Sequence, residues 1–214
     1  MTKKTLESEC LLCGSKYDRT GMTRHLQSCL TKEMDTILNQ KELKVYPFYH
    51  IQVTGTYSPE YWLHLKVKSG SRLKDLDQFL RAIWLECCGH MSAFNYQRNE
   101  LPMNRKLKEM LSPGMELLYS YDFGSTTKLL VKVIAEYQGL IQKDKSIQIL
   151  ARNVAPKILC DECGKAPAVQ ICTECQWNEK GWLCQSCVDE HECDEEMLLP
   201  VVNSPRTGVC GYEG

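Results

Sequence analysis

The sequence predicts an α+β fold in which one main helix packs on a mixed sheet, with a small cysteine-rich module at each end of the chain. Three observations predict this organisation. Polar and apolar residues alternate in several short segments of the middle region, and apolar residues recur at helical spacing in one segment there. All of the 13 cysteines except Cys87 and Cys88 lie outside this region. We therefore divide the chain into residues 1–45, 46–155 and 156–214.

The N-terminal module contains four candidate metal ligands. Cys10 and Cys13 have two residues between them, and His25 and Cys29 follow after 11 residues, with three residues between them. Residues at i and i+4 share one face of a helix, so one helix can present His25 and Cys29 to the same ion. The pattern resembles a ββα zinc finger in which cysteine replaces the last histidine, although the spacing between its pairs is one residue shorter. We expect a structural Zn²⁺ here.

The predicted finger helix continues past its ligands. Apolar residues follow at helical spacing, at Leu26, Leu30, Met34 and Ile37 or Leu38. This stripe predicts an amphipathic helix that docks on the core or on a partner. Near the start of the helix, Arg19 and Arg24 suit guanine or phosphate, but a single finger buries little surface on DNA. We therefore favour a structural or protein-docking finger over a DNA reader.

The middle region, residues 46–155, contains strand and helix patterns in the order ββαβ(α)ββ. In residues 62–68 the larger polar or aromatic side chains alternate with Leu63, Leu65 and Val67, which is typical of a strand. Apolar residues recur at helical spacing in residues 73–86, which predicts an amphipathic helix. The other predicted elements are strands over residues 46–56, 90–96, 117–122 and 128–137, and a brief helix over residues 105–111.

The C-terminal module has the most specific motif. Three C-x2-C pairs, separated by eight residues each time, precede a histidine and a last cysteine: Cys160/Cys163, Cys172/Cys175, Cys184/Cys187 and His191/Cys193. Eight ligands fill two tetrahedral sites with no open position, as structural zinc requires. We expect interleaved binding, with the first and third pairs on one ion and the second and fourth on the other. The arrangement resembles cross-braced modules of the MYND and B-box type, which act mainly in protein–protein contact.

Two features of this module stay open at the level of sequence. Sequential pairing would place Cys160 to Cys175 on one ion, and Cys210 could replace Cys193, because the spacing between His191 and Cys193 is tight. Residues 203–212 contain too many turn formers for a helix or a strand, so they form either a loop packed on the zinc module or a flexible end. In total, the sequence predicts three Zn²⁺ per chain.

Composition and charge limit the function classes. No apolar run is long enough to span a bilayer, and the first residues lack the apolar core of a signal peptide. We therefore expect no membrane association and a cytoplasmic location, where reduced thiols favour metal binding over disulfides. Residues 1–156 carry 22 basic and 16 acidic side chains, whereas residues 157–214 carry 4 and 11. Phosphate backbones should repel the acidic module, so any contact with nucleic acid belongs to the finger or the core.

The core carries further motifs. Ser58 and Pro59 precede Trp62, residues 89–94 read Gly-His-Met-Ser-Ala-Phe, and residues 119–124 read Tyr-Ser-Tyr-Asp-Phe-Gly. On these motifs and the helix over residues 73–84, residues 46–140 resemble the plasmid pRiA4b ORF-3-like family, whose members also occur as passenger proteins of insertion elements. The family commonly follows Asp-Phe-Gly with an acid, a tryptophan and a histidine, whereas this chain has Ser-Thr-Thr-Lys at residues 125–128. The resemblance implies a fold and leaves the activity open.

Four core residues form a candidate pocket: His90, Phe94, Tyr121 and Asp122. A pair of His90 and Asp122 could act in acid–base catalysis if their strands are neighbours. We favour the interpretation that Asp122 caps the turn at residues 123–124, because no nucleophile or open metal site accompanies the pair. Cys87 and Cys88 are expected to be ordinary core cysteines.

Together these patterns favour a zinc-binding adaptor that contacts a protein partner through its modules. The alternative is a nucleic-acid-associated protein of a mobile element or defence system, which the finger, the mildly basic first 156 residues and the genomic context of the resembling family favour. An enzyme that uses the region of His90 and Asp122 is the third hypothesis.

Overall fold

The computed structural model describes residues 7–38, 45–140, 145–178 and 180–214. The chain forms two compact units. Unit 1 comprises Met1–Phe79, Ser92–Ser120 and Lys128–Val154, and unit 2 comprises Leu80–Met91, Tyr121–Thr127 and Ala155–Gly214. The finger and most of the core therefore belong to one unit, whereas two short core segments belong with the C-terminal residues.

A seven-stranded sheet in the order β6-β5-β7-β8-β3-β4-β9 is the centre of the predicted core. Its strands are β3 (Tyr46–Gly55), β4 (Trp62–Lys68), β5 (Ser92–Tyr96), β6 (Asn99–Glu100), β7 (Glu116–Tyr121), β8 (Thr127–Gly139) and β9 (Ile147–Arg152). Strand β3 pairs antiparallel with β4 and β8, and β4 pairs antiparallel with β9. The α+β class is confirmed. All five predicted core strands are present, and β6 and β9 are additions at the two edges.

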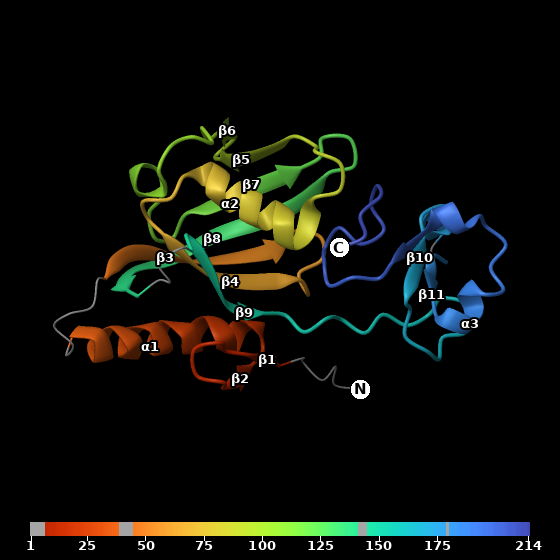
Figure 1. Ribbon diagram of the computed structural model, residues 1–214, viewed down its shortest axis with the longest axis horizontal. Coiled ribbons are helices and arrows are strands. Elements are labelled where there is room, and N and C mark those ends of the chain that lie inside the picture. Colours follow the sequence, from red (N-terminus) through yellow and green to blue (C-terminus); the bar gives the residue numbers. More distant parts are fainter. Residues whose placement is uncertain (1–6, 39–44, 141–144, 179) are drawn as a thin grey trace. The chain divides into compact units, whose positions relative to one another are not determined.

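The predicted main helix is present as α2 (Leu73–Leu80), which continues as a π-helical turn, η1 (Arg81–Leu85). Leu73, Leu76 and Leu80 are fully buried, and Figure 1 shows α2 lying across the sheet. The Asp75 carboxylate accepts a hydrogen bond from the Arg72 backbone N–H at 2.7 Å, as expected for a capped first turn. The brief helix predicted over residues 105–111 is a single 3₁₀ turn, η2 (Leu107–Glu109). Among the described residues, every helix is too short or too polar to cross a membrane.

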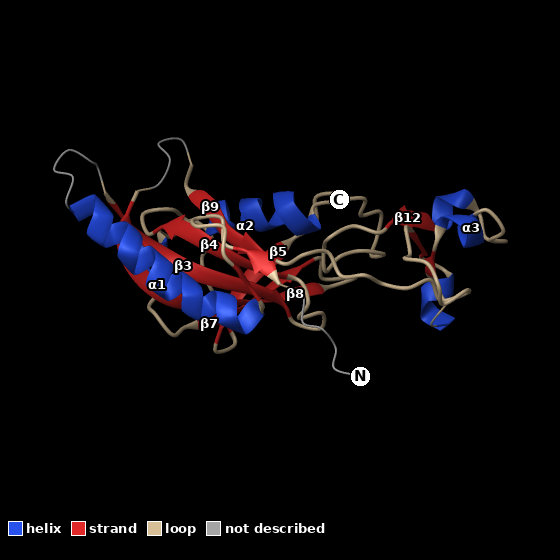
Figure 2. Cartoon of the chain, turned by 90° about the horizontal axis from the view of Figure 1, so that it is seen from below, coloured by secondary structure: helices blue, strands red, loops and turns tan. Residues whose placement is uncertain are grey.

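The N-terminal residues form a ββα finger, with strands β1 (Ser8–Glu9) and β2 (Lys16–Tyr17) followed by α1 (Arg19–Leu38). Helix α1 lies along the sheet at β3, β4 and β9 (Figures 1 and 2). Its Met22, Leu26 and Leu30 are buried in one cluster with Phe48, Trp62, Leu150 and Ala151 of those strands. The predicted stripe therefore docks on the core; the side chains of Ile37 and Leu38 lie outside the described part.

The alternation predicted for β4 is present, but both of its faces are buried. Leu63, Leu65 and Val67 occupy one face and are fully buried. The other face meets the finger helix, where Lys66 is 1% exposed and its Nζ lies 2.9 Å from Glu33 Oε2 of α1. The polar face of this strand is therefore a docking surface for the finger.

The C-terminal part of unit 2 is built on a small sheet in the order β11-β10-β12. Its elements are β10 (Gln170–Cys172), η3 (Cys175–Asn178), β11 (Trp182–Leu183), α3 (Gln185–Val188), η4 (Glu195–Met197) and β12 (Leu198–Pro200). The last residues pack against the same unit, and Ser204 and Arg206 are buried there. The Ser204 hydroxyl donates a hydrogen bond to the Trp84 carbonyl at 2.6 Å. Gln176 Nε2 donates a hydrogen bond to the Gly208 carbonyl at 2.9 Å. Of the two alternatives left by the sequence, the tail is therefore a packed loop.

Candidate metal centres

Within the described residues, four groups of cysteine and histidine side chains could each hold a metal ion, because their ligand atoms lie within 4.8 Å of one another. We name them the finger cluster (Cys10, Cys13, His25, Cys29), the first module cluster (Cys160, Cys163, Cys184, Cys187), the second module cluster (Cys172, Cys175, His191, Cys193) and the tail cluster (Cys87, Cys88, His90, Cys210). Together they contain all 13 cysteines of the chain. The sequence predicted three such sites, so the tail cluster is an addition.

The finger cluster is assembled from a tight turn and a helix. The Gly14 N–H donates to the Cys10 carbonyl at 2.8 Å, and Gly14 has φ +75°, a conformation that favours glycine. Helix α1 supplies the other two ligands, and His25 Nε2 lies 3.2 Å from Cys13 Sγ. A hydrogen bond from the Ser15 side chain lowers the pKa of Cys13 to about 6, which favours the thiolate that binds metal. Tyr17 of β2 lies near the surface and stacks on His25 with ring centroids 4.4 Å apart.

The two module clusters have the interleaved pairing that the spacing predicts. Cys163 Sγ lies 3.8 Å from Cys184 Sγ in the first cluster. In the second, Cys175 Sγ lies 3.5 Å from Cys193 Sγ and 3.7 Å from His191 Nε2. The sequential alternative would need Cys160 to share a site with Cys175, which belongs to the other cluster. Cys193 is a member of its cluster, and Cys210 belongs to a different one.

The donor sets of these three clusters fit structural zinc. With Zn–S bonds of ~2.3 Å and Zn–N bonds of ~2.0 Å, tetrahedral geometry places sulfur atoms ~3.8 Å apart and sulfur ~3.5 Å from nitrogen. The sulfur–sulfur separations of 3.5 and 3.8 Å in the two module clusters are close to that value. Each of the three clusters also contains a buried cysteine: Cys10 in the finger cluster, Cys160 in the first module cluster and Cys172 in the second module cluster. Four protein ligands leave no open coordination position, so these clusters suit a structural role.

The tail cluster joins two distant parts of the sequence. Cys87, Cys88 and His90 follow η1, and Cys210 lies 122 residues after Cys88. The expectation that Cys87 and Cys88 are ordinary core cysteines is wrong, because Cys88 is exposed and Cys87 is only partly buried. Hydrogen bonding to His90 lowers the pKa of Cys210 to about 7.

Three of the four residues of the predicted core pocket lie together. His90 Nδ1 is 3.6 Å from Asp122 Oδ1. The His90 ring packs edge-on against the Tyr121 ring, with ring centroids 5.7 Å apart. Asp122 has φ +63° and accepts a hydrogen bond from the Gly124 N–H at 2.9 Å, which is the capping role that the sequence predicts. Phe94 belongs to unit 1, where it is buried and packs on Tyr119 with ring centroids 4.5 Å apart.

A residue that the sequence reasoning did not single out, Arg206, completes this region. It is fully buried, and its Nη2 donates to Asp122 Oδ2 at 2.8 Å. This bond holds the pKa of Asp122 near 2 instead of its ordinary value of 3.8. Arg206 Nη1 also donates to Thr127 Oγ1 at 3.0 Å. The sequence marks Arg206 only as an arginine in a tail that is rich in turn-forming residues.

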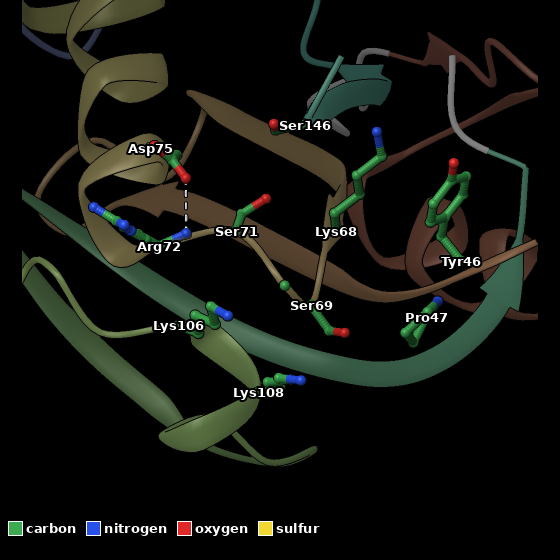
Figure 3. A pocket seen from close by; sticks show the side chains of 11 residues that line it. Tyr46, Pro47, Lys68, Ser69, Ser71, Arg72, Asp75, Lys106, Lys108 and Ser146 are labelled. Atoms are coloured by element: carbon green, nitrogen blue, oxygen red, sulfur yellow. Dashed lines mark hydrogen bonds between the residues drawn. The ribbon is translucent and has the colours of Figure 1, made fainter. Parts of the chain in front are cut away.

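Unit 1 has a separate basic pocket with a volume of about 490 Å³. Figure 3 shows its lining residues, which come from the segments around residues 46–47, 68–75, 106–108 and 146. Four of them are cationic: Lys68, Arg72, Lys106 and Lys108. Backbone hydrogen bonds fix two of the segments to each other, because Leu107 N–H donates to the Ser71 carbonyl at 2.8 Å and Lys108 N–H to the Ser69 carbonyl at 2.9 Å.

Comparisons with known proteins give little context for these sites. No protein-family model matches the chain, and no curated protein matches it. Among solved structures, the crystal structure of a protein of unknown function from Methanosarcina mazei Go1 is similar, with a TM-score of 0.44 and 17% sequence identity over 50% of this chain and 68% of that chain. The resemblance to the plasmid pRiA4b ORF-3-like family stays a prediction.

Proposed function

We propose that this protein is a zinc-stabilised adaptor whose C-terminal module binds a basic segment of a protein partner. The observation that carries the proposal is Trp177, whose side chain is 83% exposed. A tryptophan is among the side chains that contribute most to binding when an interface buries them.

Trp177 is held at a hollow in unit 2. The hollow has a volume of about 590 Å³ and is lined by residues 124–126, Thr173, Gln176, Trp177 and residues 208–210. Trp177 lies two residues after Cys175, in the short helix η3 that this ligand begins. A metal ion in the second module cluster would therefore fix the start of the helix that presents the tryptophan. A rigid aromatic anchor loses little conformational entropy on binding.

The charge around this module indicates the chemistry of the partner. Ten acidic side chains of its described residues are exposed: Asp161, Glu162, Glu174, Asp189, Glu190, Glu192, Asp194, Glu195, Glu196 and Glu213. Complementary charge speeds association and selects partners. A segment with several lysines or arginines around one large apolar side chain matches both this charge and the Trp177 hollow.

Peptide display against the zinc-loaded full chain tests this function. The Trp177→Ala variant is compared with Tyr57→Ala, which removes another exposed aromatic side chain, in unit 1. We expect the wild type and Tyr57→Ala to select the same basic consensus, and Trp177→Ala to bind its peptide at least about tenfold more weakly. Zinc content is measured for each variant, so that loss of binding is not confused with loss of metal. The absence of a consensus, or a consensus that Trp177→Ala retains, would refute the proposal.

The basic pocket of unit 1 favours nucleic-acid binding as the second candidate function. Four cationic side chains around one hollow suit the phosphates of a nucleic-acid backbone, and each such contact makes affinity fall with salt. The pocket also has an aromatic residue, Tyr46, with Lys68 Nζ 5.0 Å from its ring centroid.

Fluorescence anisotropy with labelled oligonucleotides over a range of salt concentrations tests this second function. Lys106→Gln removes one pocket charge, Arg24→Gln removes one charge from the finger helix, and Lys128→Gln is the control in the same unit. Binding through the pocket predicts that only Lys106→Gln lowers the slope of log affinity against log salt, by about 1. A slope near zero for the wild type, or equal slopes for Lys106→Gln and Lys128→Gln, would exclude binding through this pocket.

A further inference from the structure

The tail cluster has the geometry of a tetrahedral metal site. Cys88 Sγ lies 3.7 Å from both Cys87 Sγ and Cys210 Sγ, close to the ~3.8 Å expected for two sulfurs on one Zn²⁺. Cys210 Sγ lies 3.5 Å from His90 Nε2, which is the expected sulfur–nitrogen separation. Cys88 Sγ lies 2.9 Å from His90 Nε2, which is a hydrogen-bond distance, so these two atoms would move apart when they bind an ion. We propose that Cys87, Cys88, His90 and Cys210 bind a fourth Zn²⁺, which fastens the C-terminal tail to residues 87–90.

The surroundings of His90 are those of a metal-binding histidine. Its Nε2 faces the thiols, and its Nδ1 faces the Asp122 carboxylate at 3.6 Å. A carboxylate on the second ring nitrogen fixes the tautomer and orientation of histidine ligands in many metal sites. Asp122 is itself held by Arg206 and by the Gly124 N–H. The sequence left acid–base catalysis by this pair as the less favoured alternative, and this geometry fits a metal ligand and its positioning residue instead.

Arg206 balances the charge that such a site would carry. Three thiolates and one Zn²⁺ sum to a single negative charge, which is costly to leave without a partner next to a buried region. The Arg206 guanidinium is fully buried, and its Nη2 lies 3.4 Å from Cys87 Sγ. The same group contacts Asp122, so one cation serves both the ligand shell and the carboxylate behind it.

Backbone conformation on both sides of the cluster supports the assignment. Gly89 has φ +79°, which lets the chain turn between Cys88 and His90, and its N–H donates to Glu86 Oε1 at 2.6 Å. Cys210 has φ +56°, which is unfavourable for a residue with a side chain and persists only where the surroundings hold it. A bond from Cys210 to zinc supplies such a constraint. It would also fix residues 208–210, which form one wall of the Trp177 hollow.

Zinc stoichiometry of the full chain tests the proposal. The protein is purified anaerobically with a thiol reductant, and zinc per chain is measured by ICP mass spectrometry. We expect four zinc ions in the wild type, one for each cluster, and three in Cys88→Ala and Cys210→Ala. Met91→Ala is the control, because Met91 is next to His90 and 72% exposed, and it should keep four. Three ions in the wild type, or equal zinc content in the wild type and Cys210→Ala, would overturn the proposal.

Two further measurements cover the rival explanations. A denaturing mass spectrum of the wild type as purified, without any further reduction step, could show a mass that is lower by two hydrogens. If the mass of Cys210→Ala is then normal, Cys210 forms a disulfide with Cys87 or Cys88, and the zinc site is overturned. If the alanine variants do not fold, Asp122→Asn keeps the test open, because asparagine still accepts from the Gly124 N–H. In a competition titration with a chromophoric chelator, we expect one of the four zinc ions of Asp122→Asn to bind about 10- to 100-fold more weakly than in the wild type. Four unchanged affinities would contradict the role of Asp122 in a metal site.

Discussion

Replacing Leu26 with alanine should detach the finger helix from the sheet without removing its metal ligands. Leu26 is fully buried in the cluster that joins α1 to β3, β4 and β9. It lies between the ligands His25 and Cys29 on the sequence but faces the sheet with Met22 and Leu30. The substitution therefore separates docking of the finger from assembly of its metal site.

The size of the effect follows from how little the surroundings can move. A buried leucine changed to alanine costs about 2–5 kcal/mol, and the cost is highest where neighbours cannot fill the cavity. Helix α1 is fixed on one side of Leu26 by the finger cluster and on the other by the partly buried ion pair of Glu33 with Lys66. We therefore expect a loss of about 3–5 kcal/mol in the free energy of docking. Since ~1.4 kcal/mol is a factor of ten, a loss of ~3 kcal/mol corresponds to about a hundredfold.

Amide hydrogen exchange of the α1 backbone measures this loss, because local opening sets the exchange rate of a helix. Leu11→Ala is the matched control: it makes the same change in the finger at a side chain that is 61% exposed, and should change protection by less than about twofold. Zinc content is expected to stay at the wild-type value in both variants. If exchange of α1 in Leu26→Ala is no faster than in Leu11→Ala, helix α1 does not rest on the sheet in solution.

Two other predictions concern a histidine pair and a glycine. Burial lowers the pKa of His50 to about 4 and that of His64 to about 3, so between pH 6.5 and 4 the unfolded chain binds protons that the folded chain does not. The contribution of the two neutral imidazoles to the free energy of unfolding should be complete above pH 6.5 and should fall below it by about 1.4 kcal/mol per pH unit for each imidazole. Urea unfolding at pH 6.5 and 5.5 should therefore show a smaller pH dependence in His64→Gln than in the wild type. Equal pH dependence in the two proteins would contradict this prediction. In the tail, Gly208 has φ +77° and an added Cβ would lie 2.7 Å from Ile171 Cδ1, so Gly208→Ala should destabilise unit 2 by about 1–3 kcal/mol. Gly211→Ala, with nothing within 4 Å of the added Cβ, should leave thermal unfolding nearly unchanged, and similar melting of the two variants would show that the tail is not packed in this way.

Local spacing made the finger and module clusters predictable. Two cysteines with two residues between them share a turn, and residues at i and i+4 share a helix face, so each pair of ligands can be identified without knowing the fold. The same holds for β4, where alternation gives the strand and its two faces. What covers the polar face depends on a residue far away in the sequence: Glu33 of α1, 33 positions before Lys66. Neither the helical spacing of α1 nor the alternation in β4 indicates that these two residues pair.

The tail cluster was missed because its ligands are not local. Cys88 and Cys210 are 122 residues apart, and vicinal cysteines do not match the spacing of common zinc motifs. The count of cysteines nevertheless indicated a fourth site. Once the three predicted sites take ten cysteines, the three that remain of the 13 are Cys87, Cys88 and Cys210, and His90 lies two residues after Cys88. Three cysteines and a histidine are a complete tetrahedral ligand set.

Exposure of the ligands predicts the order in which a chelator removes metal. In the tail cluster, Cys88 and Cys210 are exposed and Cys87 and His90 are half-buried, whereas each of the other clusters has at least one buried cysteine. A chelator must reach the ion to displace a ligand, so we expect one zinc ion to leave faster than the other three, and this fast phase to be missing in Cys210→Ala. Release is followed with a chromophoric chelator in excess over protein, in parallel with circular dichroism. Because the fast-leaving ion fastens only the tail, the spectrum should change little in that phase and strongly in the slower ones, where zinc binding is coupled to folding. A fast phase that persists in Cys210→Ala would place the labile ion in another cluster.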